Sequence, residues 1–487
     1  MSLEAYHASR SIEHQPFRVA CYAPWVGLSF DVHGTVSVCA FTRATPLGRI
    51  GEVPLAELWR GPAATALREA LRRDDLDRSC SRCSEEIGGG NHHGVLARGF
   101  DRFRAQDPPA WPTRMEFALT NACNLRCTMC NGEFSSAIRS RREGLPPLPD
   151  RYGEAFLDEL DPFLPHLAQA RFLGGEPFLA PINFRIWERL ISLGASPDCN
   201  VTTNATVWTP RMEAVMEALP FSVGISLDGV SAATVESIRV GTDHATLLAN
   251  VERFLAYRER TGASISFTFC LMVANWHELA DYLHFADERD CDVYVNTVRQ
   301  PPRHSLHHLP TRDLAAVLER LEEDAGGTAA RLRRNRHVWD EQLARLRDHL
   351  ARRGSDDRGR NWDALARTLC DAEDDTSRIA TLRVEGGGSE PSVLEADEDD
   401  ILVSGDTYLG IEVAEFHGRP MGQLLAGVAE HLGHRAEVLA EAVEPGTLVR
   451  VVQFGQADRS PTTAVSITRR TAGGSRRLAA VLNDDQR

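Results

Sequence analysis

Three cysteines, Cys123, Cys127 and Cys130, are the residues of this 487-residue chain whose spacing points most directly to chemistry. They share one short run, with the spacing C-x3-C-x2-C. Thiolates spaced in this way can each reach a different iron of a cubane iron–sulfur cluster, which leaves the fourth iron open to a small molecule. A disulfide framework fits poorly because three is an odd number, and a zinc knuckle would need a fourth ligand nearby. We therefore expect a [4Fe–4S] cluster on this loop.

A second set of cysteines lies closer to the N-terminus. It comprises Cys21, Cys39, Cys80 and Cys83, and no further cysteine occurs before Cys123. Four thiolates saturate a cubane, so a cluster held by this set could transfer electrons or support the fold but could not bind a substrate at iron. A structural zinc site is the alternative, which the Cys80-x2-Cys83 half would suit.

The elements that must position the Cys123 loop form an alternating pattern. Short apolar runs predict strands, and segments with apolar residues at helical spacing predict helices between them. The expected strands are Met115–Thr120, Ala170–Leu173, Asn200–Thr203, Val223–Leu227, Ser264–Met272 and Val293–Val298. The expected helices are Tyr152–Leu167, Ile182–Leu193, Arg211–Leu219, Leu247–Arg258 and Glu278–Glu288. This alternation predicts an α/β fold, a partial (β/α)6 barrel, with chemistry at the carboxyl ends of its strands.

The chain divides into four predicted parts. A small module spans 1–108, the barrel spans 109–300, and a helical cap or linker spans 301–380, with helical periodicity over Leu314–Leu321 and Val338–Leu350. Residues 381–487 are expected to form a small α+β domain that recognises a substrate or partner. Its predicted elements are strands Thr447–Phe454 and Ala464–Thr468 and a helix near Met421–Leu432, an order that resembles a PAS-type sensor.

Composition limits the partners. The formal net charge of −15 argues against a nucleic-acid partner, because phosphate binding needs a basic face. The first residues lack the apolar core of a signal peptide, and no apolar run approaches the length of a membrane span. We therefore expect a cytoplasmic protein without a membrane partner, in which clustered cysteines are metal ligands rather than disulfides.

Several further segments follow the predicted strands in the order known for one superfamily. They are Gly174-Gly-Glu-Pro177, Thr202-Thr-Asn204 and Ser226-Leu-Asp-Gly229. Together with the cysteine loop, they resemble the radical S-adenosylmethionine (SAM) superfamily over about Met115 to Val298. The resemblance implies that SAM binds the open iron. An electron from the cluster then cleaves SAM to a 5′-deoxyadenosyl radical, which abstracts hydrogen from a substrate.

The same resemblance assigns cofactor contacts. Gly174, Gly175 and Pro177 would form a turn close to the cofactor, and the Glu176 carboxylate would accept from the SAM ammonium. The other implied contacts are Asn204, Ser226, the SAM carboxylate partner Arg239 and the adenine neighbour Met129. Asp228 would either contact the cofactor or cap the next helix. Ala205 replaces the family's usual glycine, which puts that turn in question.

The N-terminal cysteines are similar to those of SPASM and twitch domains, which carry auxiliary iron–sulfur clusters. Leu58-Trp-Arg60 and the helical segment Ala66–Leu71 match that module too. The resemblance implies one fully ligated auxiliary [4Fe–4S] cluster. As in radical epimerases, a thiol at the barrel mouth could donate a hydrogen atom, and Cys270 and Cys291 are the candidates beside late strands. Tyr294 and Asn296 could contact substrate.

These resemblances lead us to expect a radical SAM enzyme that oxidises, crosslinks or epimerises a peptide or small metabolite. A flavodoxin- or ferredoxin-type reductant would supply electrons. The alternative is an iron–sulfur regulatory protein with a C-terminal sensor or partner-binding domain, and a zinc-binding scaffold is a third interpretation.

Overall fold

A computed structural model describes residues 3–42, 45–76, 80–88, 90, 92–298 and 301–355. Beyond them it describes the backbone of four strands, β10 (Leu409–Glu412), β11 (Thr447–Phe454), β12 (Thr462–Thr471) and β13 (Gly474–Leu482). None of the helices in this part of the chain has the length and apolar character that crossing a bilayer would require.

The centre of the structure is a nine-stranded sheet in the order β3-β2-β1-β4-β5-β6-β7-β8-β9. From β4 to β9 all neighbours are parallel. These strands are β4 (Arg114–Phe117), β5 (Gln169–Phe172), β6 (Asp198–Thr203), β7 (Phe221–Ser226), β8 (Ile265–Leu271) and β9 (Asp292–Thr297). Each overlaps one predicted strand, and the parallel order confirms the predicted partial barrel.

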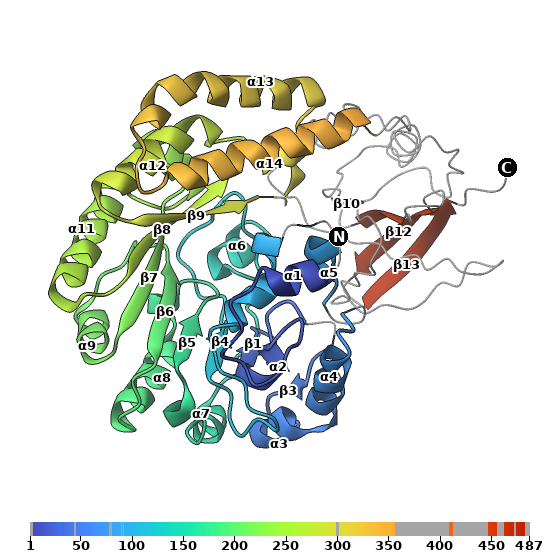
Figure 1. The fold of residues 1–487 in the computed structure, drawn as a ribbon, viewed down its shortest axis with the longest axis vertical. Helices are drawn as coiled ribbons and strands as arrows, with labels where there is room; N and C mark the ends of the chain where they lie inside the picture. The colour runs from blue at the N-terminus through green and yellow to red at the C-terminus, as the bar shows by residue number, and fades with distance from the viewer. Residues whose placement is uncertain are drawn as a thin grey trace.

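Helices line the outer side of this curved sheet (Figure 1). They are α7 (Glu154–Leu160), α8 (Pro181–Ser192), α9 (Pro210–Ala218), α11 (His244–Thr261) and α12 (Leu279–Glu288). Local chemistry fixes their ends, since the Thr209 and Asp243 side chains cap α9 and α11, and Gly262 ends α11 at a φ of 72°. Within the barrel, the sequence did not predict α6 (Ser136–Arg141) or α10 (Ala232–Ile238).

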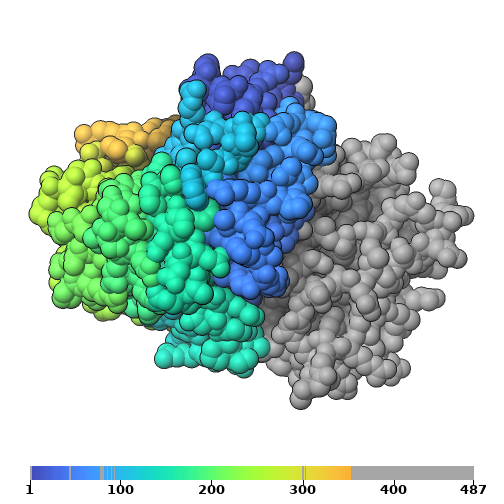
Figure 2. Space-filling model, turned by 90° about the horizontal axis from the view of Figure 1, so that it is seen from below, coloured from blue at the N-terminus to red at the C-terminus, as the bar shows by residue number. Residues whose placement is uncertain are grey.

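The N-terminal module joins the same sheet. Strand β1 (Gly27–Phe30) pairs in parallel with β4, and β2 (Thr35–Ser37) pairs antiparallel with β1 and with β3 (Gly48–Arg49). The strand ladder therefore crosses the predicted boundary at residue 108. Figure 2 shows the N-terminal residues in blue packed against the cyan and green residues of the barrel. The module's helices are α1 (Leu3–Ala8), α2 (Ala23–Val26), α3 (Leu55–Arg60), α4 (Pro62–Arg72) and α5 (Ser81–Gly88).

The two faces of the sheet differ in chemistry. The outer face is apolar, and its alternate residues, such as Phe117, Phe172 and Phe267, are fully buried beneath the helices. The register places polar or small residues opposite one another on the inner face. Its rows are Gly27-Arg114-Gln169-Asp198, Ser29-Glu116-Arg171-Asn200-Ser222, Thr202-Gly224-Ser266-Asp292, Ser226-Thr268-Tyr294 and Cys270-Asn296. This inner face can form hydrogen bonds along its whole length.

The predicted helical segment after the barrel consists of α13 (Thr311–Glu323) and α14 (Arg336–Ser355). Asn335, which is fully buried, docks it by accepting from Val293 N at 2.9 Å and donating to the Cys291 carbonyl at 2.9 Å. In the C-terminal region, β10 to β13 form an antiparallel sheet that includes both predicted strands. The predicted helix at 421–432 lies outside the described residues.

Candidate functional site

The Cys123 loop leaves the carboxyl end of β4 and is held by backbone and side-chain contacts from three directions. The Asn121 side chain donates to the Gly132 carbonyl at 2.8 Å, and Ser135 Oγ donates to the Leu125 carbonyl at 2.7 Å. The amides of residues 126 and 128 donate to the carbonyls of 240 and 238, beyond β7, at 2.9 Å each. Hydrogen bonds from the rest of the barrel therefore hold the loop that carries the three cysteines.

Arg142, at the end of α6, is a contact that the sequence did not predict. Its guanidinium donates to the carbonyls of Cys127 and Cys130. The positive charge lowers the pKa of Cys130, although burial, the larger effect, raises that pKa to about 12. No local pattern marks Arg142, because its role depends on how α6 folds back over the loop.

The Gly174-Gly-Glu-Pro177 turn packs directly against this loop. A side chain at Gly175 would lie 2.3 Å from the Ala122 carbonyl oxygen, and Gly175 has a φ of 53°. The Glu176 amide donates to the same carbonyl at 2.7 Å. The turn's glycine thus allows close approach to the cysteine loop, whereas the sequence predicted close approach to the cofactor.

The Glu176 carboxylate is fully buried and accepts three hydrogen bonds. The donors are Thr203 Oγ1 at 2.8 Å, Asn204 N at 2.7 Å and Phe178 N at 3.1 Å. A carboxylate has about four acceptor positions, so one remains for a ligand ammonium. Burial raises the pKa of Glu176 to about 6, against the lowering effect of these bonds.

Asn204 connects the third strand-end motif to the cysteine loop. Its Nδ2 donates to Asn124 Oδ1 at 3.1 Å and lies 3.9 Å from Cys123 Sγ. The next residue, Ala205, has the left-handed φ of 54° that a glycine would adopt freely. The turn geometry is therefore kept, and the Ala205 carbonyl is bonded by Asn250 Nδ2 at 2.9 Å.

Asp228 and Arg239 form a buried ion pair at 2.7 Å. Asp228 Oδ1 also accepts from Cys270 N at 2.6 Å, and the Asp228 side chain is fully buried. Burial lowers the pKa of Arg239, but the Asp228 carboxylate outweighs it and the net shift is upward. Asp228 does not cap α10, since Ser231 does so. The direct cofactor contact of Asp228 stays a prediction, and in the structure its carboxylate is bonded to Arg239 and Cys270 N.

A small apolar cluster lies beside this ion pair. Ile238, Met272 and Val298 are its buried members, and Met129 and Cys270 pack against it half-buried. Ser226, at the end of β7, is on the inner face near the same cluster. The predicted cofactor contacts thus lie together at the carboxyl end of the parallel strands.

The two predicted hydrogen-atom donors lie far apart. Cys270 is near the carboxyl end of β8 on the inner face, whereas Cys291 directly precedes the neighbouring strand β9 and therefore lies at the amino end of the parallel strands. Cys291 is buried there and accepts from Arg258 at 3.3 Å. The prediction that Cys291 serves as a donor at the barrel mouth is therefore wrong, because a position before a late strand is not a position at its end.

Buried polar groups at the carboxyl end of the strands fit a charged ligand. Arg239 Nε and Thr128 Oγ1 are buried without a hydrogen-bond partner among the described residues. Burial raises the pKa of Cys127 to about 11, while Arg239 lowers it. Three thiols, a buried guanidinium and a free acceptor position on Glu176 match a cluster with a bound amino acid cofactor.

The four N-terminal cysteines line one pocket, which also has apolar walls that include Phe41, Leu71 and Phe100. Its empty space is about 480 Å³, counting the part open to solvent. Burial raises the pKa of Cys39 and of Cys80 to about 12 in each case. The convergence of four cysteines from three separate segments fits a fully ligated cluster.

No three His, Cys, Asp or Glu side chains in the described residues converge as tightly as a single metal ion requires. Such close convergence is what a site for one metal ion needs. A cubane instead takes one thiolate at each of several irons, as the two cysteine sets offer.

The two cysteine sites lie at opposite ends of the inner face. The Cys123 loop follows the carboxyl end of β4, whereas Cys39 follows β2, which runs antiparallel to β1. Cys39 lies near Arg114, at the start of β4, because the Cys39 thiolate and the Arg114 guanidinium each shift the pKa of the other. The four residues of β4 separate these levels by roughly 10–13 Å. Between them, Arg171 donates to Glu116 at 2.8 Å and to Asn200 at 3.1 Å, a polar network absent from the sequence prediction.

Comparison with protein families gives two matches. Residues 117–286 match the Radical SAM superfamily, and residues 21–84 match an iron–sulfur cluster-binding domain, SPASM. A GTP 3′,8-cyclase of Listeria welshimeri is 31% identical over 191 residues, which are 37% of this chain and 52% of the relative. The chain thus spans about half the length of that curated relative.

Two solved structures resemble parts of the chain. Native anSMEcpe with bound AdoMet is 19% identical with a TM-score of 0.32, over 43% of this chain and 61% of that one. SuiB of Streptococcus suis bound to S-adenosylmethionine is 13% identical with a TM-score of 0.33, over 56% and 62%.

Proposed function

From the premise that this chain carries a radical SAM domain at residues 117–286 preceded by a SPASM domain at 21–84, we propose that it is a radical SAM enzyme with one auxiliary cluster. The carrying observation is the placement of the two cysteine sites at opposite ends of one polar inner face. A substrate on that face lies between a site of radical formation and a site that can take up or supply an electron.

When bound, the cluster of Cys123, Cys127 and Cys130 with SAM supplies a 5′-deoxyadenosyl radical. The chain's own residues bind and orient the cofactor. Glu176 offers its remaining acceptor position to the SAM ammonium, and Arg239, held by Asp228, offers its unpaired Nε to the carboxylate. Met129 and the neighbouring apolar side chains exclude water beside the adenosyl group.

The inner face supports a polar substrate. Its rows of Ser, Thr, Asn and Gly offer hydrogen bonds and leave room, and no aliphatic side chain faces it in the register. A peptide or a polar metabolite fits that chemistry. Oxidation or crosslinking would release an electron toward the Cys39 end, and epimerisation would use Cys270 as hydrogen donor. A flavodoxin- or ferredoxin-type protein would act as the reductant.

The test is anaerobic reconstitution followed by metal analysis and a SAM cleavage assay with dithionite. Wild-type protein should hold about eight irons, the content of two cubanes. The triple variant Cys123→Ala/Cys127→Ala/Cys130→Ala should keep about four irons and form no 5′-deoxyadenosine. The double variant Cys80→Ala/Cys83→Ala is the matched control, which should still cleave SAM.

Wild-type protein that holds two clusters but forms no 5′-deoxyadenosine would contradict the proposed activity and favour an iron–sulfur regulatory protein. Zinc in place of half of the iron would contradict the auxiliary cluster.

A further inference from the structure

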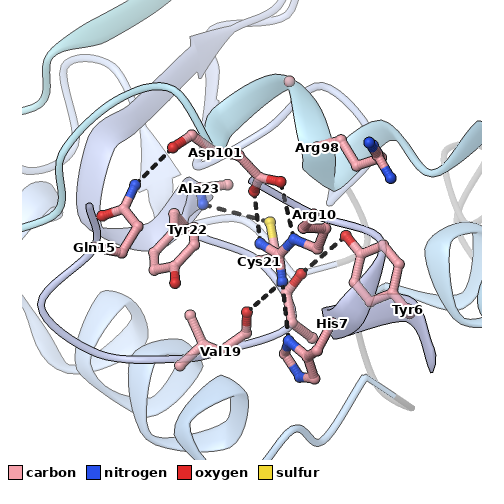
Figure 3. A network of polar contacts seen from close by, with 12 residues as sticks. Tyr6, His7, Arg10, Gln15, Val19, Cys21, Tyr22, Ala23, Arg98 and Asp101 are labelled. Atoms are coloured by element: carbon pink, nitrogen blue, oxygen red, sulfur yellow. Dashed lines mark hydrogen bonds and ion pairs between the residues drawn. The ribbon is translucent and has the colours of Figure 1, made fainter. Parts of the chain in front are cut away.

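Arg10 lies beside the N-terminal cysteine pocket and is completely buried. Its Nε and Nη2 donate to the two oxygens of Asp101 at 2.9 and 2.6 Å, and its Nη1 donates to the Val19 carbonyl at 2.7 Å. The rings of Tyr6 and Tyr22 lie 4.8 and 5.3 Å from its central carbon. Figure 3 shows this guanidinium among its partners, together with Cys21.

These contacts join two walls of the pocket. Val19 belongs to the segment that carries Cys21, and the next carbonyl along it, of Ala20, accepts from Tyr6 Oη at 3.2 Å. Asp101 follows the 3-10 helix Leu96–Phe100, whose residues Ala97 and Phe100 form another part of the lining. The segment around Cys21 has no helix or strand of its own before residue 23, so these bonds fix where the Cys21 sulfur stands.

Arg10 and Asp101 place two buried charges behind the Cys21 side of a pocket whose lining, apart from its cysteines, Thr42 and Arg82, is apolar. The Cys21 sulfur acts electrostatically on both Arg10 and Tyr6, so the network lies within electrostatic reach of the sulfur. A buried cation near a cluster favours the form with one more electron, and a buried carboxylate disfavours it, because the low local dielectric screens neither charge.

We propose that the Arg10–Asp101 pair positions Cys21 and sets the reduction potential of the auxiliary cluster. The inference rests on the auxiliary cluster in the proposed function. Arg10 acts through Cys21 and is a positioning residue. The two charges predict opposite effects: loss of the cation makes the cluster harder to reduce, and loss of the anion makes it easier to reduce.

The experiment uses the full chain with Cys123→Ala/Cys127→Ala/Cys130→Ala as background, so that only the auxiliary cluster contributes to the spectra. A redox titration followed by electron paramagnetic resonance gives the midpoint potential of each variant. For Arg10→Met we expect a midpoint potential about 59 mV more negative than that of the background protein. At the midpoint potential of the background protein, the ratio of reduced to oxidised cluster would then be about tenfold lower. Asp101→Asn keeps the shape of the acceptor and should raise the same ratio.

Arg68→Met is the matched control. Arg68 is also a buried arginine near the pocket and bonds the Pro24 and Trp59 carbonyls at 2.8 and 2.9 Å, but no cysteine is among the groups that shift its pKa. It should leave the potential unchanged. If Arg10→Met fails to fold, Asp101→Asn alone decides the matter, since an unchanged or more negative potential would overturn the proposal. Shifts of the same sign in both variants would overturn it too. A background protein without iron would instead overturn the auxiliary cluster itself.

Discussion

Glu176 has a different set of partners in the structure from the one its motif implies. The sequence predicted that the Glu176 carboxylate accepts a hydrogen bond from the SAM ammonium. In the structure it accepts hydrogen bonds from Thr203, Asn204 and Phe178. The motif located the residue correctly because its spacing from β5 is local. Phe178 is a local partner, two residues along the same turn, but Thr203 and Asn204 come from β6 and the turn after it. A single sequence does not reveal such contacts between strands.

This environment predicts an unusual pH dependence. Burial raises the pKa of Glu176 from 4.5 to about 6, so the folded state holds its proton more tightly than the unfolded state does. Stability contributed by the protonated form should therefore fall as pH rises from about 4.5 to about 6, by about 2 kcal/mol in all. Glu176→Gln should remove this fall, measured as the unfolding midpoint of metal-free protein across that range.

Glu278→Gln is the control with the opposite sign. Burial raises the pKa of Glu278, but bonds from Ser231, Thr234 and Val230 outweigh it and the net shift is downward. The ionised form is stabilising, so wild-type protein loses this contribution as pH falls, and the variant should not. An identical pH profile for wild type and Glu176→Gln would contradict the role assigned to Glu176.

At the scale of elements, the turns that follow the strands do more than carry ligands. The turn after β5 and the loop after β4 pack backbone against backbone at Gly175 and Ala122. The six strands from β4 to β9 were predictable, because each is a short apolar run between helical patterns. The pairing of β1 with β4 was not, since register between distant segments leaves no local pattern.

Gly175→Ala should therefore reduce the iron content of the Cys123 site. An added methyl group would meet the Ala122 carbonyl at 2.3 Å, and the residue's φ of 53° adds strain. Cluster loading should fall from about eight irons toward about four, since only one of the two cubanes depends on this loop. Iron analysis after reconstitution is the measurement.

Gly194→Ala separates strain from contact. Gly194 has a similar φ of 66°, but no atom lies within 4 Å of the position of an added methyl group. This variant should lose about 1 kcal/mol of stability and keep its full iron content. Equal iron loss in both variants would show that backbone strain alone explains the effect.

At the scale of the whole molecule, one hydrophobic core holds the N-terminal module, the barrel and the two following helices together. The same cluster of buried side chains includes Tyr6, Phe117, Phe267 and Leu346. The division predicted from composition separates these parts at residues 108 and 300, but composition does not record which apolar faces meet. The core shows that neither cysteine site belongs to an isolated unit.

A chain truncated after residue 355 should fold and keep both sites. Among the residues whose burial the structure describes, every member of that core lies at or before residue 350, and both cysteine sets precede residue 131. We expect about eight irons per truncated chain and SAM cleavage at the full-length rate. Full-length protein prepared in parallel is the control, and aggregation or loss of iron in the truncated chain would contradict this prediction.

The parallel pairing of β1 with β4 also has a consequence for synthesis. Gly27 is opposite Arg114, which the ribosome adds 87 residues later, an interval of roughly 4–17 s at about 5–20 residues per second. During that interval Cys21, Cys39, Cys80 and Cys83 have all been made, but the strand that completes their support has not. The newborn chain therefore carries all four thiols for roughly 1.5–6 s, the time taken to add the 31 residues from Cys83 to Arg114. We expect a reducing environment to favour its maturation, because it would keep these thiols from oxidising before their support is complete.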